Sequence, residues 1–241
     1  MSTPSFRPVL SSHLTLPSRL ARFRDLHRGE RVVIVCNGPS LNAMDLGFLR
    51  HEIVIGLNKI HLGLDRFGFY PRYLVAVNPR VVEQARAELA AMSAIRFIGA
   101  RAAAHLPEDA FTHHVPVLDP PVVFSRDLTQ GFREGGTVTH AALQVAWWMG
   151  FSEVVIIGMD HRFTFEGAPH EARVMAGPDP NHFSPDYFAG QTWDNPDLTR
   201  SEASYAVARQ VFESTGRRIL DATVDGACQV FEKIDHRLIF R

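Results

Sequence analysis

Short, uninterrupted apolar runs recur along the chain and are separated by stretches with helical spacing. Each run is rich in β-branched residues and lacks the alternation of a half-exposed strand, which is typical of strands covered by helices on both faces. We predict strands over 31–36, 52–57, 73–77, 95–98, 153–157 and 218–220, and helices over 41–50, 81–92, 139–149 and 201–214. This order predicts an α/β fold, a single Rossmann-like, doubly wound and mainly parallel sheet.

Two segments stand outside this alternation. In residues 16–27, Leu16, Leu20, Phe23 and Leu26 recur every three or four positions, which predicts an amphipathic helix within an N-terminal extension, residues 1–29. We expect this helix to pack on the main domain, residues 30–241. An amphipathic helix can also bind a membrane surface, so a peripheral association with a membrane is the alternative.

The second segment, about 160–198, follows the strand that ends in Gly158-Met159-Asp160 and is rich in proline, histidine and aromatic residues. Long stretches without periodicity inside a compact domain are usually functional loops. We therefore expect a lid-like insertion, called the insertion below.

Composition narrows the class of protein. With 46% hydrophobic residues, the 241-residue chain can form one large domain, and its 25 basic against 26 acidic residues give no basic field for nucleic acid. The two cysteines, Cys36 and Cys228, lie too far apart in sequence to indicate a zinc knuckle or a disulfide scaffold. Without a long apolar run or a leader, we expect a cytoplasmic protein with no membrane span.

The carboxyl ends of the predicted strands carry the candidate binding residues. In a doubly wound sheet, ligands bind where the winding reverses at this edge. The first strand leads into Asn37, Gly38 and Ser40, and the next two strands end at Asn58 and Asn78. Neutral amides both donate and accept, so they suit a base or a ribose, although Asn is also common in turns. The turn has neither the glycines of a dinucleotide fingerprint nor the Gly-Lys-Ser/Thr of a phosphate loop.

Two further candidates lie at the same predicted edge. Gly136 and Thr137 precede the helix 139–149, whose N-terminal N–H groups suit an anion. Asp160 ends its strand with a carboxylate that binds a ribose hydroxyl, holds Mg²⁺ or caps a turn.

Several motifs of this chain resemble the hydroxymethylpterin diphosphokinase MptE-like domain family. They are VCNGPSL at 35–41, GLNK at 56–59, VNP at 77–79, GGTVTHAAL at 135–143, IGMD at 157–160, PNHFSPDYF at 180–188 and GRRILDATVDG at 216–226. The turn, the asparagines, the Thr and the G-x-D are more distantly similar to bacterial sialyltransferases of glycosyltransferase family 42. That resemblance implies a CMP-sugar held by Asn37, Gly38, Ser40, Asn58, Asn78, Thr137 and Asp160.

The sequence departs from the sialyltransferase pattern at the catalytic positions. His161-Arg162 stands where that family has a tyrosine, and the histidine of the insertion is out of register. We expect Arg162 to neutralise the leaving phosphate and His182 to act as general base, with His161, His170 and Asp186 as rival bases. Asp160, Arg162 and His182 are thus the candidate catalytic residues.

These observations lead to a functional hypothesis. We expect a transferase that moves a sugar, such as an acidic sialic-acid-type residue, from a CMP-activated donor to a hydroxyl acceptor in bacterial surface-glycan synthesis. The alternatives are an Mg-ATP-dependent diphosphokinase acting on a hydroxymethylpterin-like alcohol and a nucleotide-binding module without catalysis. We expect no tightly bound cofactor and no metal site, and the oligomeric state stays open.

Overall fold

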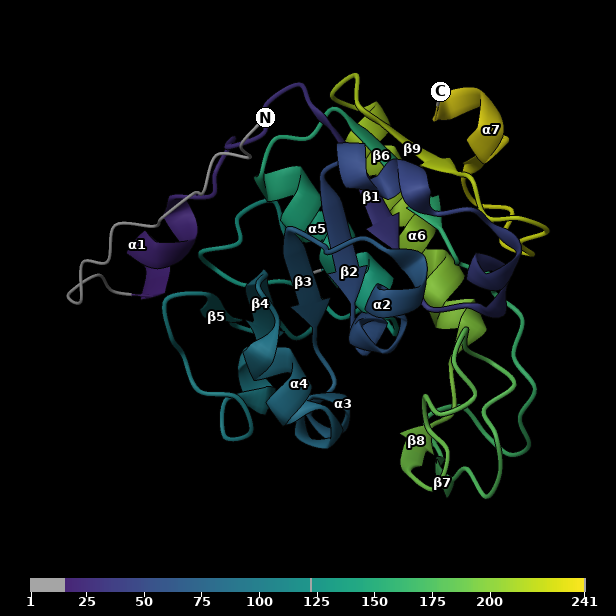
Figure 1. The fold of residues 1–241 in the computed structure, drawn as a ribbon. Coiled ribbons are helices and arrows are strands. Elements are labelled where there is room, and N and C mark those ends of the chain that lie inside the picture. The colour runs from purple at the N-terminus through teal and green to yellow at the C-terminus, as the bar shows by residue number, and fades with distance from the viewer. Residues whose placement is uncertain (1–15, 122, 241) are drawn as a thin grey trace.

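A central sheet of parallel strands organises the molecule, a computed structural model that describes residues 16–121 and 123–240 (Figure 1). Within these residues the sheet has eight strands in the order β10-β9-β6-β1-β2-β3-β4-β5. The strands are β1 (Arg31–Val35), β2 (Val54–Leu57), β3 (Tyr73–Ala76), β4 (Ile95–Gly99), β5 (Thr112–Val115), β6 (Glu153–Ile157), β9 (Arg218–Asp221) and β10 (Glu232–Lys233). Each neighbouring pair is parallel, so the predicted α/β doubly wound fold is confirmed.

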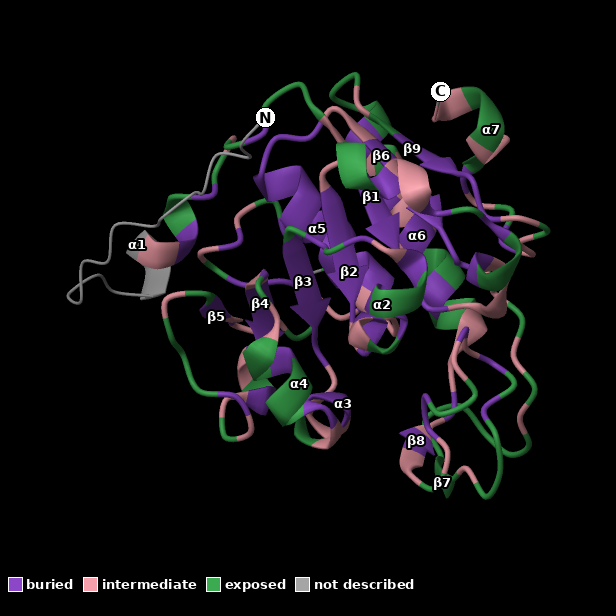
Figure 2. Cartoon of the chain, in the orientation of Figure 1, coloured by how far each residue is buried: buried purple, intermediate pink, exposed green. Residues whose placement is uncertain are grey.

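The apolar runs form strands because both of their faces are covered. Residues 32–35 of β1 are fully buried, and β1 pairs with β2 on one side and with β6 on the other. Figure 2 shows the central strands as buried along their length. Strand β5 was not predicted, because His113 and His114 interrupt its apolar pattern.

Two layers of helices enclose the sheet. One core cluster joins the sheet to α5 (Val138–Trp148) and α6 (Leu198–Glu213), and the other joins it to α2 (Leu64–Phe67), α3 (Pro79–Gln84) and α4 (Arg86–Ala91). Helix α5 is buried on nearly all sides, which fits its apolar sequence. A short helix, α7 (His236–Ile239), closes the described chain.

The predicted helix over 41–50 is wrong. This stretch forms two 3₁₀ turns, η1 (Pro39–Ala43) and η2 (Gly47–His51), and the intervening Met44 is extended. The Asp45 carboxylate accepts a hydrogen bond from the Gly47 N–H at 3.0 Å, a local bond that competes with a helix. Two more 3₁₀ turns are η3 (Ile60–Gly63) and η4 (Ala100–Ala102). The predicted helix over 81–92 is divided at Ala85 into α3 and α4.

The N-terminal segment packs on the domain, as expected. Helix α1 (Leu16–Ala21) is shorter than predicted and is followed by turns, and Leu20 and Phe23 are buried in the core. Arg19 donates to the Glu108 carboxylate at 2.9 Å. The division at residue 29 and the peripheral association with a membrane stay predictions. No helix in the described ranges is long and apolar enough to span a membrane.

The insertion packs against the carboxyl edge of the sheet and contains a small antiparallel pair, β7 (Ala172–Val174) and β8 (Thr192–Asp194). Its Phe183, Tyr187 and Trp193 are buried in the same core cluster as α3 and α4. The Phe183 N–H donates to the Asn37 carbonyl at 2.8 Å. These contacts fix the insertion over the site described next.

Candidate functional site

A cavity of about 470 Å³ opens at the carboxyl ends of β1, β2, β3 and β6, between the sheet and the insertion. Strand β1 lies between β2 and β6, so the chain winds outward in opposite directions from this point. The sheet therefore places the cavity where doubly wound folds bind ligands. Of the predicted site residues, the cavity wall contains Asn37, Gly38, Asn58, Asn78, Gly136, Thr137, Asp160, Arg162 and His182.

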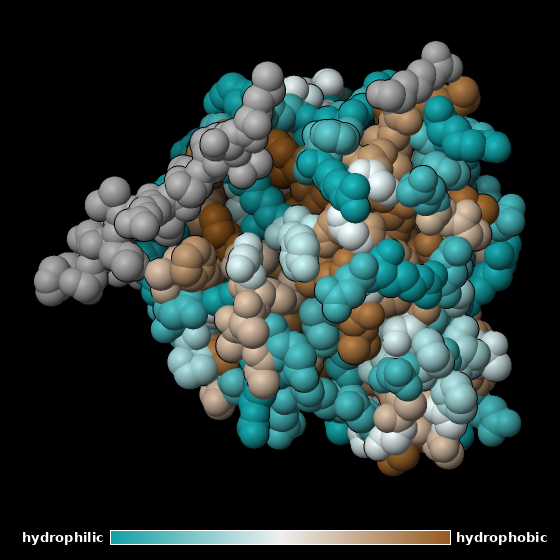
Figure 3. Space-filling model, viewed as in Figure 1, coloured by the Kyte–Doolittle hydropathy of each residue, from teal (hydrophilic) through white to brown (hydrophobic). Residues whose placement is uncertain are grey.

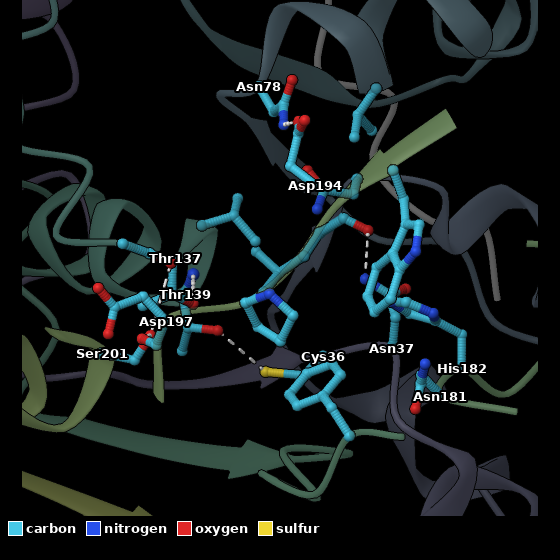
Figure 4. Close-up of a pocket in the computed structure, with 18 of the residues that line it drawn as sticks. Cys36, Asn37, Asn78, Thr137, Thr139, Asn181, His182, Asp194, Asp197 and Ser201 are labelled. Carbon is cyan, nitrogen blue, oxygen red and sulfur yellow. Dashed lines mark hydrogen bonds between the residues drawn. The ribbon is translucent and has the colours of Figure 1, made fainter. Parts of the chain in front are cut away.

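Asn37 presents an unpartnered acceptor in this cavity. Its side chain is buried, with 8% exposure, and its Nδ2 donates to the Leu57 carbonyl at 3.0 Å (Figure 4). This bond fixes the orientation of the amide, and no described residue donates to Oδ1. A buried acceptor without a donor costs free energy, about 1–3 kcal/mol. A bound ligand with an N–H or O–H group would remove that cost.

Of the other two strand-end asparagines, Asn58 also has a buried Oδ1 without a donor among the described residues, whereas Asn78 has partners for both ends of its amide. Asn78 is fully engaged, since its Oδ1 accepts from the Arg80 N–H at 2.9 Å and its Nδ2 donates to Asp194 at 3.0 Å. It caps α3 and holds the insertion. Asn58 lines the cavity with a left-handed backbone, φ 47°, which Asn adopts more readily than most residues.

Asp160 accepts two hydrogen bonds from Ser40 at the switch point, the place between β1 and β6 where the winding of the sheet reverses. The Asp160 carboxylate accepts from the Ser40 N–H at 3.0 Å and from the Ser40 hydroxyl at 2.6 Å. Gly38 makes this possible, because a Cβ there would lie 1.9 Å from Asp160 Oδ2. Both carboxylate oxygens thus stabilise the turn. Ser40 itself does not line the cavity, and its contact with a nucleotide stays a prediction.

The N-terminus of α5 forms the opposite wall. Gly136 has φ 82° and Thr137 caps the helix, accepting from the Thr139 N–H at 3.2 Å. The Thr137 hydroxyl also lies 3.2 Å from the Tyr205 hydroxyl of α6. Cys36, on the floor, contacts Thr139, and burial raises the pKa of its thiol to about 12, so it stays protonated. The first N–H groups of an 11-residue helix favour an anion here.

Arginines add positive charge to the cavity. Arg162 and Arg200 line the cavity, and neither forms an ion pair with an acidic side chain of the described residues. The stem of Arg200 packs over Gly136, where a Cβ would lie 3.1 Å from the Arg200 Cγ. Arg80 and Arg101 also line the cavity but face Asp194 at 3.5 Å and Glu134 at 3.7 Å. A phosphate in this cavity would find two guanidinium groups without an acidic partner among the described residues.

His182 stands on the side of the insertion, near Asn37 and Asn181 (Figure 4). Its Nδ1 lies 2.8 Å from Oδ2 of Asp179, whose side chain is completely buried. The Asp179 carboxylate only accepts, so in a neutral ring Nδ1 carries the proton and Nε2 is the acceptor, to which no described residue donates. The imidazole stacks on Tyr187 with centroids 3.9 Å apart and planes 3° from parallel. An oriented imidazole with a free Nε2 is suited to accept a proton.

The rival bases are less well placed. His161 and His170 line the cavity, but His161 pairs with Glu202 at 3.0 Å and His170 with Asp197 at 3.4 Å. Asp186 is exposed and does not line the cavity. Across the residues that the structure describes, no three His, Cys, Asp or Glu side chains form a group suited to a metal ion.

Sequence reasoning missed Asp179, Asn195, Arg200 and Lys59. For Asp179 a signal was present, because Asp and His three residues apart in a turn-rich segment can meet side to side. Asn195, which is almost completely buried, donates to the Glu166 and Ala168 carbonyls and leaves its Oδ1 unpartnered among the described residues. Asn195 lines the cavity, but it lies in the insertion, whose sequence has no periodicity from which its position could be predicted.

The fold and the cavity define an α/β protein of the Rossmann-like class with a cavity at its switch point. Residues 10–166, more than half of the chain, match the family described as 6-hydroxymethylpterin diphosphokinase MptE-like, and the chain belongs to this family. The resemblance seen in the motifs is thereby confirmed. No protein of curated function matches the sequence.

Among solved structures, the chain is similar to the MAf glycosyltransferase from Magnetospirillum magneticum AMB-1. The two share 13% sequence identity and a TM-score of 0.56 over 92% of this chain. The chain spans 38% of the length of that protein. At this identity the likeness shows a common fold.

Proposed function

We propose that this protein is a glycosyltransferase-like enzyme that takes a sugar from a CMP-activated donor and passes it to a hydroxyl acceptor. The observation that carries the proposal is the imidazole of His182, which is oriented by the buried Asp179 and lines the same cavity as the N-terminus of α5 and Arg162. A base on one wall and an anion site on the other are what transfer from a sugar phosphate requires. The similarity in fold to a glycosyltransferase supports the same class.

The residues suggest how the reaction would proceed. The acceptor oxygen attacks the anomeric carbon of the sugar while His182 Nε2 takes the hydroxyl proton. The bond between that carbon and the phosphate oxygen breaks, and its electron pair leaves with CMP. The N-terminus of α5 and the guanidinium groups of Arg162 and Arg200 would stabilise the charge that develops on the phosphate.

The neutral donors and acceptors of the cavity support a nucleotide as the leaving group. Asn37 Oδ1 has no donor among the described residues, and the amino group of cytosine or a ribose hydroxyl would supply one. A sialic-acid-type sugar and a role in bacterial surface-glycan synthesis remain part of this proposal.

The description of the family favours a second candidate, an Mg-ATP-dependent diphosphokinase. Mg²⁺ is held mainly by carboxylates and phosphates. The cavity carboxylates already have protein partners. Asp160 accepts from Ser40, Asp194 from Asn78, and Asp197 from the Arg200 N–H. This donor set does not suit the ion, so the transferase is the better supported of the two.

Release of CMP from a CMP-activated sialic-acid-type sugar tests the proposal, because water can replace the acceptor. We expect the wild-type protein to release CMP and His182→Ala to be slower by about 10²–10⁴-fold, the usual contribution of a general base. Asp186→Ala, in the same segment but outside the cavity, is the matched control and should keep the wild-type rate. A His182→Ala variant as fast as wild type would refute the role of His182.

A further inference from the structure

Lys59 is a buried cation with no assigned role. It follows Asn58 at the end of β2, and the residue is only 3% exposed. Its Nζ donates to three uncharged oxygens: Gln84 Oε1 at 2.9 Å, the Tyr187 carbonyl at 2.8 Å and Gln191 Oε1 at 2.6 Å. The ammonium also lies 4.3 Å from the centre of the Phe188 ring. All three of its donors are therefore used, and two of their acceptors belong to the insertion.

Burial of this ammonium group costs free energy. No carboxylate of the described residues forms an ion pair with Lys59, and burial lowers the pKa of its ammonium to about 8, with Asp179 and Glu88 raising it in part. The folded protein thus retains a charge whose desolvation opposes folding. A buried ammonium group with a lowered pKa, next to a cavity residue, is a candidate for a functional role.

Tyr187 connects Lys59 to His182. The ammonium of Lys59 holds the Tyr187 carbonyl, and the backbone N–H of Lys59 donates to the Tyr187 hydroxyl at 3.3 Å. Lys59 therefore holds both ends of Tyr187. The face of that ring is the surface on which the His182 imidazole is stacked.

We propose that Lys59 is a positioning residue that fixes the insertion through Tyr187 and thereby sets the orientation of the His182 imidazole. Asp179 selects the tautomer of His182 from the Nδ1 side, and the Lys59–Tyr187 contact holds the plane of the ring. This inference rests on the proposed function in one respect, that His182 is the base. The placement of the His182 ring can be measured without turnover.

Lys59→Met tests the inference, since it keeps the length of the side chain and removes its three hydrogen bonds. We expect amide hydrogen exchange in residues 180–192 to be at least about tenfold faster than in wild type, with the amides of β1 and β6 unchanged. We also expect ¹⁵N NMR of His182 to change from a single Nδ1–H tautomer to a mixture. Arg50→Met, which removes an exposed cation, is the control and should leave both readouts unchanged.

Unchanged exchange in 180–192, an unchanged tautomer, or acceleration spread evenly over the sheet would overturn the inference. If Lys59→Met does not fold, Gln191→Leu removes one acceptor and should give a smaller, equally confined acceleration, and its absence there would also overturn it. The measurement uses the protein without nucleotide. A wild-type protein that fails to bind CMP would therefore contradict the proposed function and leave this result standing.

Discussion

At the scale of single residues, the chemistry depends on groups that hold other groups in place. Asp179 is buried, does not itself line the cavity, and would act through the His182 ring. Its two oxygens are used by His182 Nδ1 and by the Asn181 N–H at 2.8 Å. The carboxylate thus fixes both the tautomer of His182, the proposed base, and the loop that carries it.

Asp179→Asn should lower turnover more than binding. An amide at this position can donate to Nδ1, which would move the proton of the neutral ring to Nε2 and remove the free acceptor. We expect kcat for CMP release to fall at least about tenfold while KM for the donor changes less than about twofold. Asp186→Asn is the control for charge in the same segment. Equal losses in kcat and in donor affinity would indicate a folding defect and contradict the positioning role.

Gly38 tests the packing of the switch point. A Cβ at Gly38 would lie 1.9 Å from Asp160 Oδ2 and 2.7 Å from the Gly158 carbonyl, so Gly38→Ala must displace the turn. We expect a loss of about 1–3 kcal/mol in the free energy of unfolding, measured by urea denaturation. Gly177→Ala is the matched control, because a Cβ there would meet nothing within 4 Å. A Gly38→Ala protein as stable as wild type would show that Asp160 does not depend on this close approach.

At the scale of elements, the sequence predicted those parts whose local pattern matches their final environment. The strands β1, β2, β3, β4, β6 and β9 are apolar runs, and the strand-end residues Asn37, Asn58 and Asn78 follow from them. Helix α5 is recognisable by its Thr cap. The site residues of the sheet could be placed because every parallel strand delivers its carboxyl end to one edge.

Other elements depend on tertiary contacts that no local pattern shows. The 41–50 segment has helical spacing, yet its Asp45–Gly47 contact and the extended Met44 divide it into two turns. Lys59 and Gln191 are 132 residues apart in sequence and meet only because the insertion returns to β2. The path of the insertion could not be deduced from a stretch without periodicity, so its partners were missed.

At the scale of the whole molecule, buried neutral histidines make stability dependent on pH. Burial is the largest cause that lowers the pKa of His113 to about 3 and of His140 to about 4, against 6.5 for the unfolded chain. Below pH 6.5 the unfolded state therefore binds more protons, and stability falls as the pH falls toward 4. The slope should reach about 1.4 kcal/mol per pH unit for each histidine.

Urea denaturation between pH 7 and pH 4 checks this expectation. His140→Gln should lose part of the pH dependence, because it removes one group that must stay neutral in the fold. His51→Gln, at an exposed position, is the control and should follow the wild-type curve. A His140→Gln protein with the full wild-type slope would contradict the assignment.

On the face shown in Figure 3, hydrophobic residues occur in small areas separated by hydrophilic ones. The switch-point cavity joins the sheet, the N-terminus of α5 and the insertion, and residues from all three line it. The function is therefore best tested by asking what this cavity binds.

Calorimetric titration of the wild-type protein with CMP, and with ATP in the presence and absence of Mg²⁺, tests the central claim most directly. We predict that CMP binds without metal and that Asn37→Ala, which removes one of the unpartnered acceptors, weakens binding by at least about tenfold. Gln130→Ala, which removes an exposed amide outside the cavity, should bind CMP as wild type does. Binding of ATP that requires Mg²⁺, with no binding of CMP, would contradict the account and favour the diphosphokinase.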